Sequence, residues 1–349
     1  MTSEMISLTL SDPSKGLCSH HIAKEAPLNQ EKVEMSAQLE IPLFGDATHY
    51  LSREHHTFSF AAGHAPAITV SPGELIHIQT WDCYKGAITN PENALLPIPD
   101  SEINPATGPI FVQGAEPGDT LSVTIHDIKP GLRGVARTYP GNGQLQHLIE
   151  KPYAQFFDVV DGVVTMNERV SFPSSPMLGV IGVAPETGEI PTMPAGKHGG
   201  NLDNNLNGIG ATVHLPVKHP GALLGIGDMH ASMGDGEICG TGIEIAGDVL
   251  ISVQLIKGVG TEYPVTENKD CWVTHGVCVD DLSSALQIAC EEAAQLLVGH
   301  WGFTIEAAFI FLSVQGNLGI AQAVHPSSGT VIAKMVVPKL PACPGPFNI

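Results

Sequence analysis

The stretch EPGDTLSVTI, residues 116–125, places a glycine turn directly before a run of alternating apolar residues. Two other stretches repeat this pattern, SPGELIHIQT at 71–80 and AGDVLISVQL at 246–255. Glycine adopts turn conformations that a side chain with a Cβ atom resists, and the alternation then places every second side chain on one face of a strand. The three stretches therefore predict three strand starts. Their spacing is too irregular for a solenoid or a propeller.

The composition extends the β prediction to most of the chain. Among 349 residues, 38 glycines and 27 prolines separate short apolar stretches, as in strands joined by tight turns. With 43 % hydrophobic and 15 % charged residues, the chain has a globular composition and not a disordered or collagen-like one. A chain of this length forms one or two compact domains.

Helices are predicted near the C-terminus. Leucine and alanine recur at helical spacing over residues 282–297, after the potential N-cap Asp281 and before Gly299 in a stop position. A second, shorter helix is expected after the cap candidate Thr304. The following GTVIAKMVVP, residues 329–338, predicts a closing strand.

The charge balance excludes two classes of partner. Sixteen lysines and arginines stand against 36 acidic residues, and the formal net charge of −20 has the wrong sign for binding nucleic acid or an anionic membrane surface. The longest apolar run, 307–312, is far shorter than a membrane span. Seven cysteines without a C-x-x-C pair predict reduced thiols. We therefore expect a cytoplasmic protein.

The segment GIGDMHASMGDGE, residues 225–237, concentrates ionisable side chains between glycines. On an extended segment Asp228 and His230 would project from one face, where a carboxylate and an imidazole can bind one cation. Asp235 and Glu237 follow with the same spacing, so one could bind the cation and the other accept a proton. The pattern predicts one side of a metal site.

A second polar cluster lies upstream, in KHGGNLDNN at 197–205, where His198 and Asp203 accompany two glycines. A catalytic zinc takes about three protein ligands and leaves a position for water. Asp203, Asp228 and His230 would supply these ligands and leave Glu237 as general base. Zn²⁺ suits this mixed set better than Ca²⁺, which prefers oxygen ligands alone.

The same polar residues are also compatible with purely structural roles. Asp-Gly and Gly-Asp pairs are common in turns, and a histidine can be hydrogen-bonded at a strand end. DNNLNG at 203–208 begins like a calcium loop, but His214 stands where the loop requires a bidentate glutamate, so it is not an EF-hand. Cys239 could act as a nucleophile, although a small buried side chain is the favoured interpretation. Asp82, after the strand at 71–80, is expected to cap a turn.

Several segments together resemble the acetamidase/formamidase family, and the G-D-x-H-A-x-x-G-D-G-E block is specific to it. The similarity spans roughly residues 49–340. It implies hydrolysis of a short aliphatic amide, formamide or acetamide, to a carboxylate and ammonia. It also implies a homodimer or higher homo-oligomer, with zinc or calcium in some members. The segments are TGPIFVQGAEPGDTLSV (107–123), HGGNLD (198–203), GDMHASMGDGEICGTGIE (227–244) and SVQGNLGIAQAV (313–324), the last expected to be helical.

The resemblance implies a mainly β fold with a jelly-roll-like β-sandwich, a β-barrel-like part and a small α+β C-terminal part. We accordingly expect an N-terminal extension at 1–48 and a jelly-roll-like domain at 49–190. The catalytic part, with the α+β segment, is expected at 191–349.

The expected mechanism uses a divalent metal to activate water and polarise the amide carbonyl, while a carboxylate moves the proton from water to nitrogen. Two alternatives stay open: hydrolysis of a cyclic amide, carbamoyl compound or amino-acid amide, and a non-catalytic metal-binding β protein. The family motif carries over to His198, Asp203, Asp228, His230, Asp235 and Glu237. Of these, we expect Asp203, Asp228 and His230 to bind the metal and Glu237 to be the base, with Asp235 and His198 positioning them.

Overall fold

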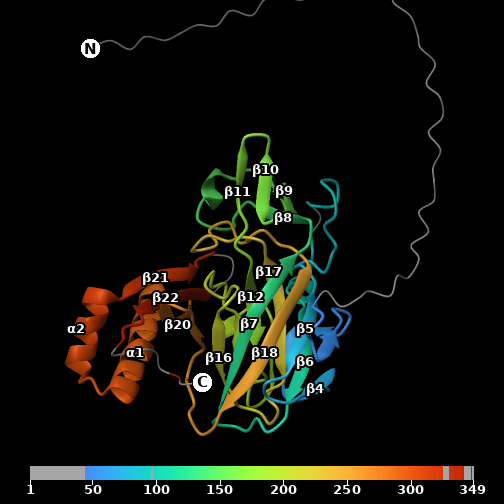
Figure 1. The fold of residues 1–349 in the computed structure, drawn as a ribbon. Helices are drawn as coiled ribbons and strands as arrows, with labels where there is room; N and C mark the ends of the chain where they lie inside the picture. Colours follow the sequence, from blue (N-terminus) through green and yellow to red (C-terminus); the bar gives the residue numbers. More distant parts are fainter. Residues whose placement is uncertain (1–43, 96, 325–329, 342–346, 348–349) are drawn as a thin grey trace, which may run out of the picture. The chain divides into compact units, whose positions relative to one another are not determined.

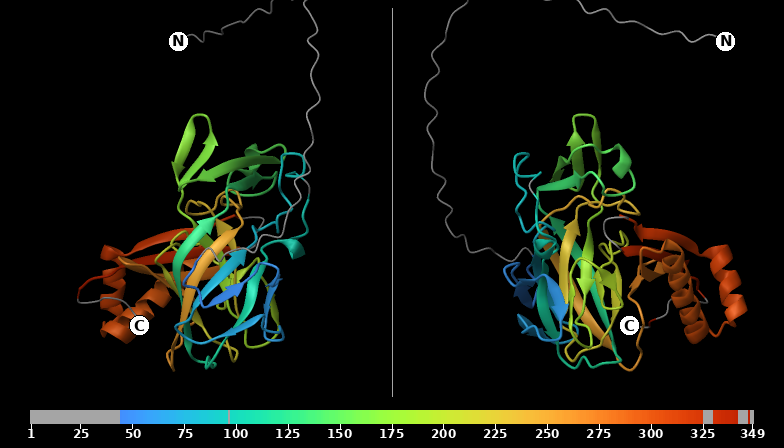
Figure 2. Two further views of the ribbon diagram at one scale, coloured as in Figure 1. Left: turned by 45° about the vertical axis from the view of Figure 1, so that its right-hand side comes forward. Right: turned by 180° about the vertical axis from the view of Figure 1, so that it is seen from behind.

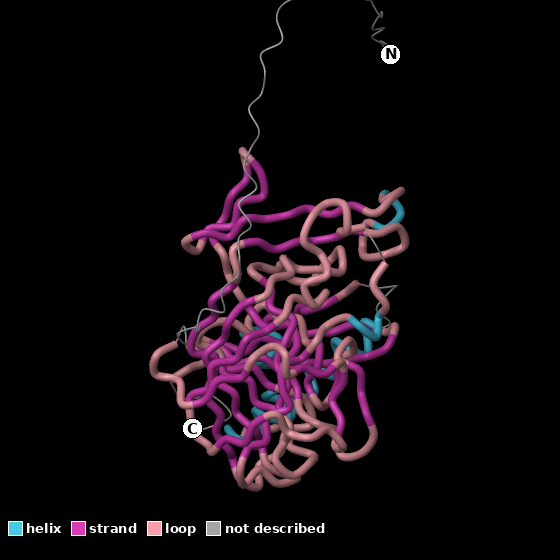
Figure 3. Tube along the Cα trace, turned by 90° about the vertical axis from the view of Figure 1, so that its right-hand side faces the viewer, coloured by secondary structure: helices cyan, strands magenta, loops and turns pink. Residues whose placement is uncertain are grey.

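The structure, a computed structural model, describes residues 44–95, 97–324, 330–341 and 347 (Figure 1). Strands dominate these residues, as Figure 3 shows, and the described chain has two α-helices. This confirms the mainly β prediction. Residues 41–349 form one compact unit, and most of the extension predicted at 1–48 lies outside the described residues.

The largest sheet in the described chain has nine strands. The three stretches that begin with a glycine turn form its neighbouring strands β5 (Leu75–Thr80), β18 (Gly247–Ile256) and β7 (Thr120–Pro130), which confirms the predicted strand starts. β18 pairs antiparallel with both of the others. The remaining strands are β1 (His49–Leu51) next to β5, and then, beyond β7, β16 (Thr212–Pro216), β19 (Val265–Glu267), β20 (Cys271–Val279), β22 (Thr330–Pro338) and β21 (Asn317–Gln322).

A seven-stranded sheet carries the strand ends that form the site described below. Its order is β14 (Ala195–Gly196), β15 (Gly199–Asn201), β12 (Met177–Gly182), β17 (Leu224–His230), β6 (Ala106–Val112) and β2 (His56–Thr57), with β4 (Ile68–Val70) beside β6.

The two large sheets share one hydrophobic core. Alternate residues Leu121, Val123 and Ile125 of β7 are fully buried in it, together with Leu178 of β12 and Ile226 of β17. Each such aliphatic side chain contributes about 1.5–3 kcal/mol when it leaves water. Strand alternation therefore joins the sheets face to face, as in a β-sandwich.

Two smaller sheets complete the described β structure. The four-stranded sheet lies at the top of Figure 1, above the ends of β12 and β17. It consists of β11 (Val170–Pro173), β10 (Val163–Asn167), β9 (Tyr153–Val160) and β8 (Arg133–Thr138). The two-stranded sheet pairs β13 (Glu189–Pro191) with β3 (Ser59–Ala61).

Helices α1 (Leu282–Trp301) and α2 (Ile305–Gln315) pack beside β20–β22, as both views of Figure 2 show. The N-caps Asp281 and Thr304 and the closing strand are as predicted. The predicted stop at Gly299 is wrong. The helix continues to Trp301, whose ring packs 5.7 Å from that of Trp272, and ends at Gly302 with φ 67°.

The expectation that 313–324 is helical is also wrong for most of the segment. Helix α2 ends at Gln315, and Asn317–Gln322 form strand β21, which pairs with β22 at the edge of the nine-stranded sheet. Pairing to a long neighbouring strand outweighs the local preference for helix. This strand brings Gln322 to the site.

Both large sheets combine strands from before and after residue 190. In the nine-stranded sheet, β5 and β7 precede this position and β16 and β18 follow it, so the expected domain boundary falls inside the sheets.

No single helix in the described ranges has the length and apolar character of a membrane span. The bent pair α1 and α2, at 118°, meets that test by length and composition only.

Candidate active site

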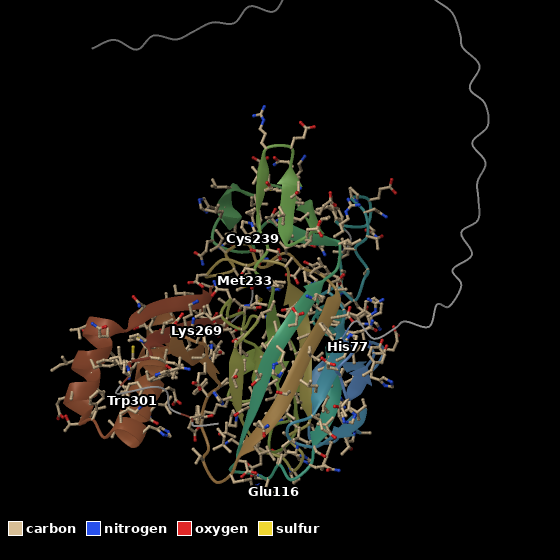
Figure 4. All side chains as sticks on the ribbon, viewed as in Figure 1. His77, Glu116, Met233, Cys239, Lys269 and Trp301 are labelled. Atoms are coloured by element: carbon tan, nitrogen blue, oxygen red, sulfur yellow. The ribbon has the colours of Figure 1, made fainter. Side chains whose placement is uncertain are left out.

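A pocket of about 590 Å³ lies between β8, β17, β21 and the loop that joins β17 to β18. Figure 4 labels Met233 and Cys239 in this loop, which lies between the β8–β11 sheet and the ends of β12 and β17. The polar side chains that line the pocket belong to segments far apart in the sequence. They include Cys83, Asn104, Arg137, Asn201, Asp228, Glu237, Glu244 and Gln322.

Asp228 and His230 converge at the end of β17. His230 Nε2 lies 3.5 Å from Asp228 Oδ1, and both side chains are buried. Both residues lie in β17, which keeps one register with β12 from Gly225 to His230, and Asp228 has a φ of 53°. Gly179 of β12 leaves the room they need, since a Cβ atom there would lie 2.5 Å from Asp228 Oδ2 and 2.6 Å from Asp203 Oδ1.

Asp203 reaches the same place from the loop after β15. The backbone N–H groups of Leu202 and Asp203 donate to Gly179 O at 2.9 and 3.3 Å, which fixes the loop beside β12. Asp203 is fully buried and has a φ of 39°. Its segment, DNNLNG, lies between strands β15 and β16, so the described chain has no helix pair around it and the exclusion of an EF-hand is confirmed.

Glu237 lies in the β17–β18 loop, which is attached to the edge strand β21. The backbone N–H of Gly236 donates to Ala321 O at 2.9 Å, and Glu237 itself has a φ of 44°. Gln322 Nε2 donates to Glu237 Oε2 at 3.0 Å and also to Asp203 Oδ2. One amide group therefore holds the expected base and an expected ligand together.

Glu244, Cys83 and Gln322 are site residues that the sequence did not single out. Glu244 Oε1 lies 3.0 Å from His230 Nε2. Cys83 is buried in the turn after β5 and lines the pocket with Glu244. Asp82, in the same turn, accepts hydrogen bonds from two backbone N–H groups at 2.8 and 2.9 Å, so its predicted turn-capping role is confirmed. Glu244 and Gln322 lie in two of the segments that resemble the family, 227–244 and 313–324, and this was the signal for them, whereas Cys83 lies in none of these segments.

Six of these side chains form three overlapping groups, in each of which the potential ligand atoms lie within 4.8 Å of one another. The first group is the ligand set expected from the sequence. Carboxylate, imidazole and thiolate are all ligand types that zinc accepts. The groups are Asp203–Asp228–His230, Cys83–Asp228–Glu244 and His230–Glu237–Glu244.

The sequence profile of the Acetamidase/Formamidase family matches residues 59–191 and 187–339 of this chain. The chain belongs to the acetamidase/formamidase family. The matched ranges include all six residues of the three groups.

Individual family members resemble the chain over most of its length. An acetamidase of Mycolicibacterium smegmatis is 28 % identical over 74 % of this chain and 84 % of its own length. The crystal structure of a predicted acetamidase/formamidase from Thermoanaerobacter tengcongensis is 40 % identical, with a TM-score of 0.80 over 83 % of this chain and 95 % of its own. A provisionally named formamidase of Schizosaccharomyces pombe is 29 % identical over 55 % of this chain, and the chain spans only 62 % of that relative's length.

Burial dominates the protonation of the acids in this acetamidase/formamidase family member. Burial raises the pKa of Glu237 to about 7 and that of Glu244 to about 8. His230 opposes both of these pKa increases, and Asp228 adds to them. Burial, with Glu237 and Asp228, also raises the pKa of Asp203 well above its usual range. Burial acts to lower the pKa of His230, but Glu244 and Asp228 outweigh it and raise that pKa well above its usual value.

Three other residues considered in the sequence lie outside the three groups. Asp235 is exposed, and its Oδ1 pairs with Lys334 Nζ at 2.5 Å. His198 is buried and packs 5.2 Å from the Phe60 ring, outside the pocket lining, and burial lowers its pKa to about 4. Cys239 Sγ donates to Thr241 O at 3.5 Å and belongs to none of the groups among the described residues.

Proposed function

We propose that this protein is an amidohydrolase that cleaves the C–N bond of short aliphatic amides, formamide or acetamide, to yield a carboxylate and ammonia. Its relatives' names, acetamidase and formamidase, support hydrolysis of linear amides. The observation that carries the proposal is the convergence of Glu237 with the Asp203–Asp228–His230 group beside a pocket.

The donor atoms suit a divalent metal. Asp203 Oδ1 and His230 Nε2 are buried and have no hydrogen-bond partner among the described residues. Buried polar atoms are nearly always paired, so these atoms favour a cation. Asp203, Asp228 and His230 would hold it, and the mixed nitrogen and oxygen set supports zinc over calcium. When bound, such a metal makes water more acidic and polarises a carbonyl.

Glu237 supplies the proton transfer in this mechanism. Its carboxylate accepts a proton from the attacking water, whose oxygen forms a bond to the amide carbon. Glu237 then returns the proton to nitrogen as the C–N bond breaks, and ammonia leaves. Gln322 holds the carboxylate through its 3.0 Å hydrogen bond. Asp235 and His198 have supporting roles, with Asp235 anchoring the loop to Lys334.

The variant Glu237→Gln tests this assignment. We expect kcat/KM for acetamide to fall by about 10²- to 10⁴-fold, because the amide cannot accept the proton. Ammonia release measures the rate, and elemental analysis should show unchanged metal content. Glu186→Gln, at an exposed glutamate, is the control and should keep wild-type activity. Near-normal turnover of Glu237→Gln would show that another group is the base.

An amide panel tests the substrate. Formamide and acetamide should exceed cyclic amides, carbamoyl compounds and amino-acid amides in kcat/KM. A tenfold advantage for a larger compound would displace the simple-amide assignment. A metal-loaded protein inert toward every amide would favour the non-catalytic metal-binding alternative.

We also propose a cytoplasmic homodimer or higher homo-oligomer. The described cysteines are free thiols, which supports a reducing compartment. Exposed Phe309, Ile310 and Val314 on α2 form an apolar face of the kind that subunits cover. Light scattering coupled to size-exclusion chromatography would give the subunit count, and a monomer would refute the assembly.

A further inference from the structure

The group Cys83–Asp228–Glu244 contains a thiol that the proposed mechanism does not use. Its ligand atoms lie within 4.8 Å of one another, as do those of the Asp203–Asp228–His230 group, and Asp228 belongs to both. The two groups differ in position. Cys83, Asp228 and Glu244 all line the pocket, whereas Asp203 and His230 are not part of its lining.

The site contains more buried acidic groups than one divalent cation balances. Asp203, Asp228, Glu237 and Glu244 are 0 %, 3 %, 7 % and 2 % exposed. His230 is a basic side chain placed against two of them, Asp228 and Glu244, and the buried Arg137 also lines the pocket. An uncompensated buried carboxylate is strongly unfavourable. One divalent cation balances two carboxylates, and a second would balance part of the negative charge that remains.

Unsatisfied atoms lie where a second cation would bind. Glu244 directs Oε1 toward His230 at 3.0 Å, while its Oε2 is buried and has no hydrogen-bond partner among the described residues. The thiol of Cys83 is buried next to this glutamate. Burial favours the protonated thiol over the charged thiolate. A metal ion that binds the sulfur has the opposite effect, because binding displaces the proton and leaves a thiolate ligand.

We propose that Cys83, Asp228 and Glu244 hold a second divalent cation, of the thiolate-accepting kind such as zinc, in the wall of the pocket. The inference rests on the proposed function, because the first cation occupies Asp203, Asp228 and His230. On binding, the Cys83 S–H bond breaks, its proton passes to solvent and a metal–sulfur bond forms.

Cobalt titration of the full-length protein tests the second site. The chelator-treated protein is titrated with cobalt chloride under anaerobic conditions, because Co²⁺ reports a thiolate ligand by a charge-transfer absorption in the near ultraviolet. We expect two equivalents of cobalt per chain and this absorption. Cys83→Ser should bind one equivalent and lose the absorption. Asp203→Asn, which impairs only the first group, should keep it.

Cys239→Ser is the matched control, because Cys239 lies near the pocket but outside the three groups. It should bind two equivalents and keep the absorption. If the active wild-type enzyme binds one equivalent of cobalt and shows no charge-transfer absorption, the second site is refuted and the proposed function stays intact. An absorption that persists in Cys83→Ser would also overturn it. Full amide hydrolysis after complete metal removal would instead overturn the metal mechanism itself.

Discussion

Gln322 connects two acidic residues that are far apart in sequence. Its Nε2 donates to Asp203 and to Glu237, which lie 119 and 85 positions away. The backbones of both acids are in the left-handed region, with φ of 39° and 44°, at a cost of about 1–3 kcal/mol each. Such conformations persist only where surrounding contacts enforce them, and the Gln322 amide is one of these contacts.

Replacement of Gln322 by leucine should weaken both the fold and the activity. The lost hydrogen bonds to buried carboxylates correspond to about 1.5–3 kcal/mol of unfolding free energy, and kcat/KM should fall at least tenfold because Glu237 loses its orientation. Urea unfolding and ammonia release measure the two effects. Gln287→Leu removes a similar bond, to Glu291 at 2.7 Å, on the exposed face of α1 and should cost about 0.2–0.5 kcal/mol. Equal losses in the two variants would contradict this role.

The packing of α1 on the sheet depends on one residue of β20. A Cβ atom at Gly276 would collide with Ala285 O and lie 2.5 Å from Ala289 N. The helix presents small side chains to the same surface, where Ala285, Ala289 and Ala293 are fully buried. This close approach is the reason that a glycine interrupts an otherwise well-formed strand.

Gly276→Ala should therefore push the helix away from β20. Overpacking typically costs about 1–3 kcal/mol, and a clash with backbone belongs at the upper end. Gly299→Ala makes the same chemical change inside α1, where a Cβ atom would meet nothing within 4 Å. This control should be neutral or stabilising by up to about 1 kcal/mol, because alanine favours helix. Urea unfolding of both variants decides the point, and equal stability would show that the close approach does not require glycine.

His275 connects the C-terminal sheet region to the loop that carries Asp203. Its Nδ1–H donates to Pro264 O at 2.8 Å, and its Nε2 accepts from Asn204 Nδ2 at 2.9 Å, so the ring is neutral. Burial lowers its pKa from 6.5 to about 4, with Lys334 adding to the shift and Pro264 opposing it. The folded protein therefore resists protonation that the unfolded chain accepts.

The stability that the neutral His275 ring contributes should fall as pH decreases between these two values. The unfolded state binds the extra proton below pH 6.5 and the folded state only near pH 4, so the contribution of the neutral ring is complete above 6.5 and is lost on acidification. Between pH 7 and pH 5 this loss is about 2 kcal/mol. Urea unfolding of His275→Gln should show a shallower pH dependence by that amount. His147→Gln, at an exposed histidine, should match the wild type, and parallel curves for all three proteins would refute the assignment.

The amino-acid sequence by itself determined the features that arise from neighbouring residues. Glycine turns before alternating apolar residues predicted β5, β7 and β18, and the caps Asp281 and Thr304 predicted where two helices begin. These signals are local, because turns, caps and side-chain periodicity act over a few residues. The dense polar segments also indicated Asp203, Asp228 and His230, which do lie together.

Only the tertiary structure decided which other side chains reach the site. Cys83 comes from the turn after β5, Glu244 from the end of a loop and Gln322 from an edge strand expected to be helical. Asp235 instead pairs with Lys334 outside the pocket. Strand order sets these positions, and it depends on contacts between distant segments that no local pattern encodes.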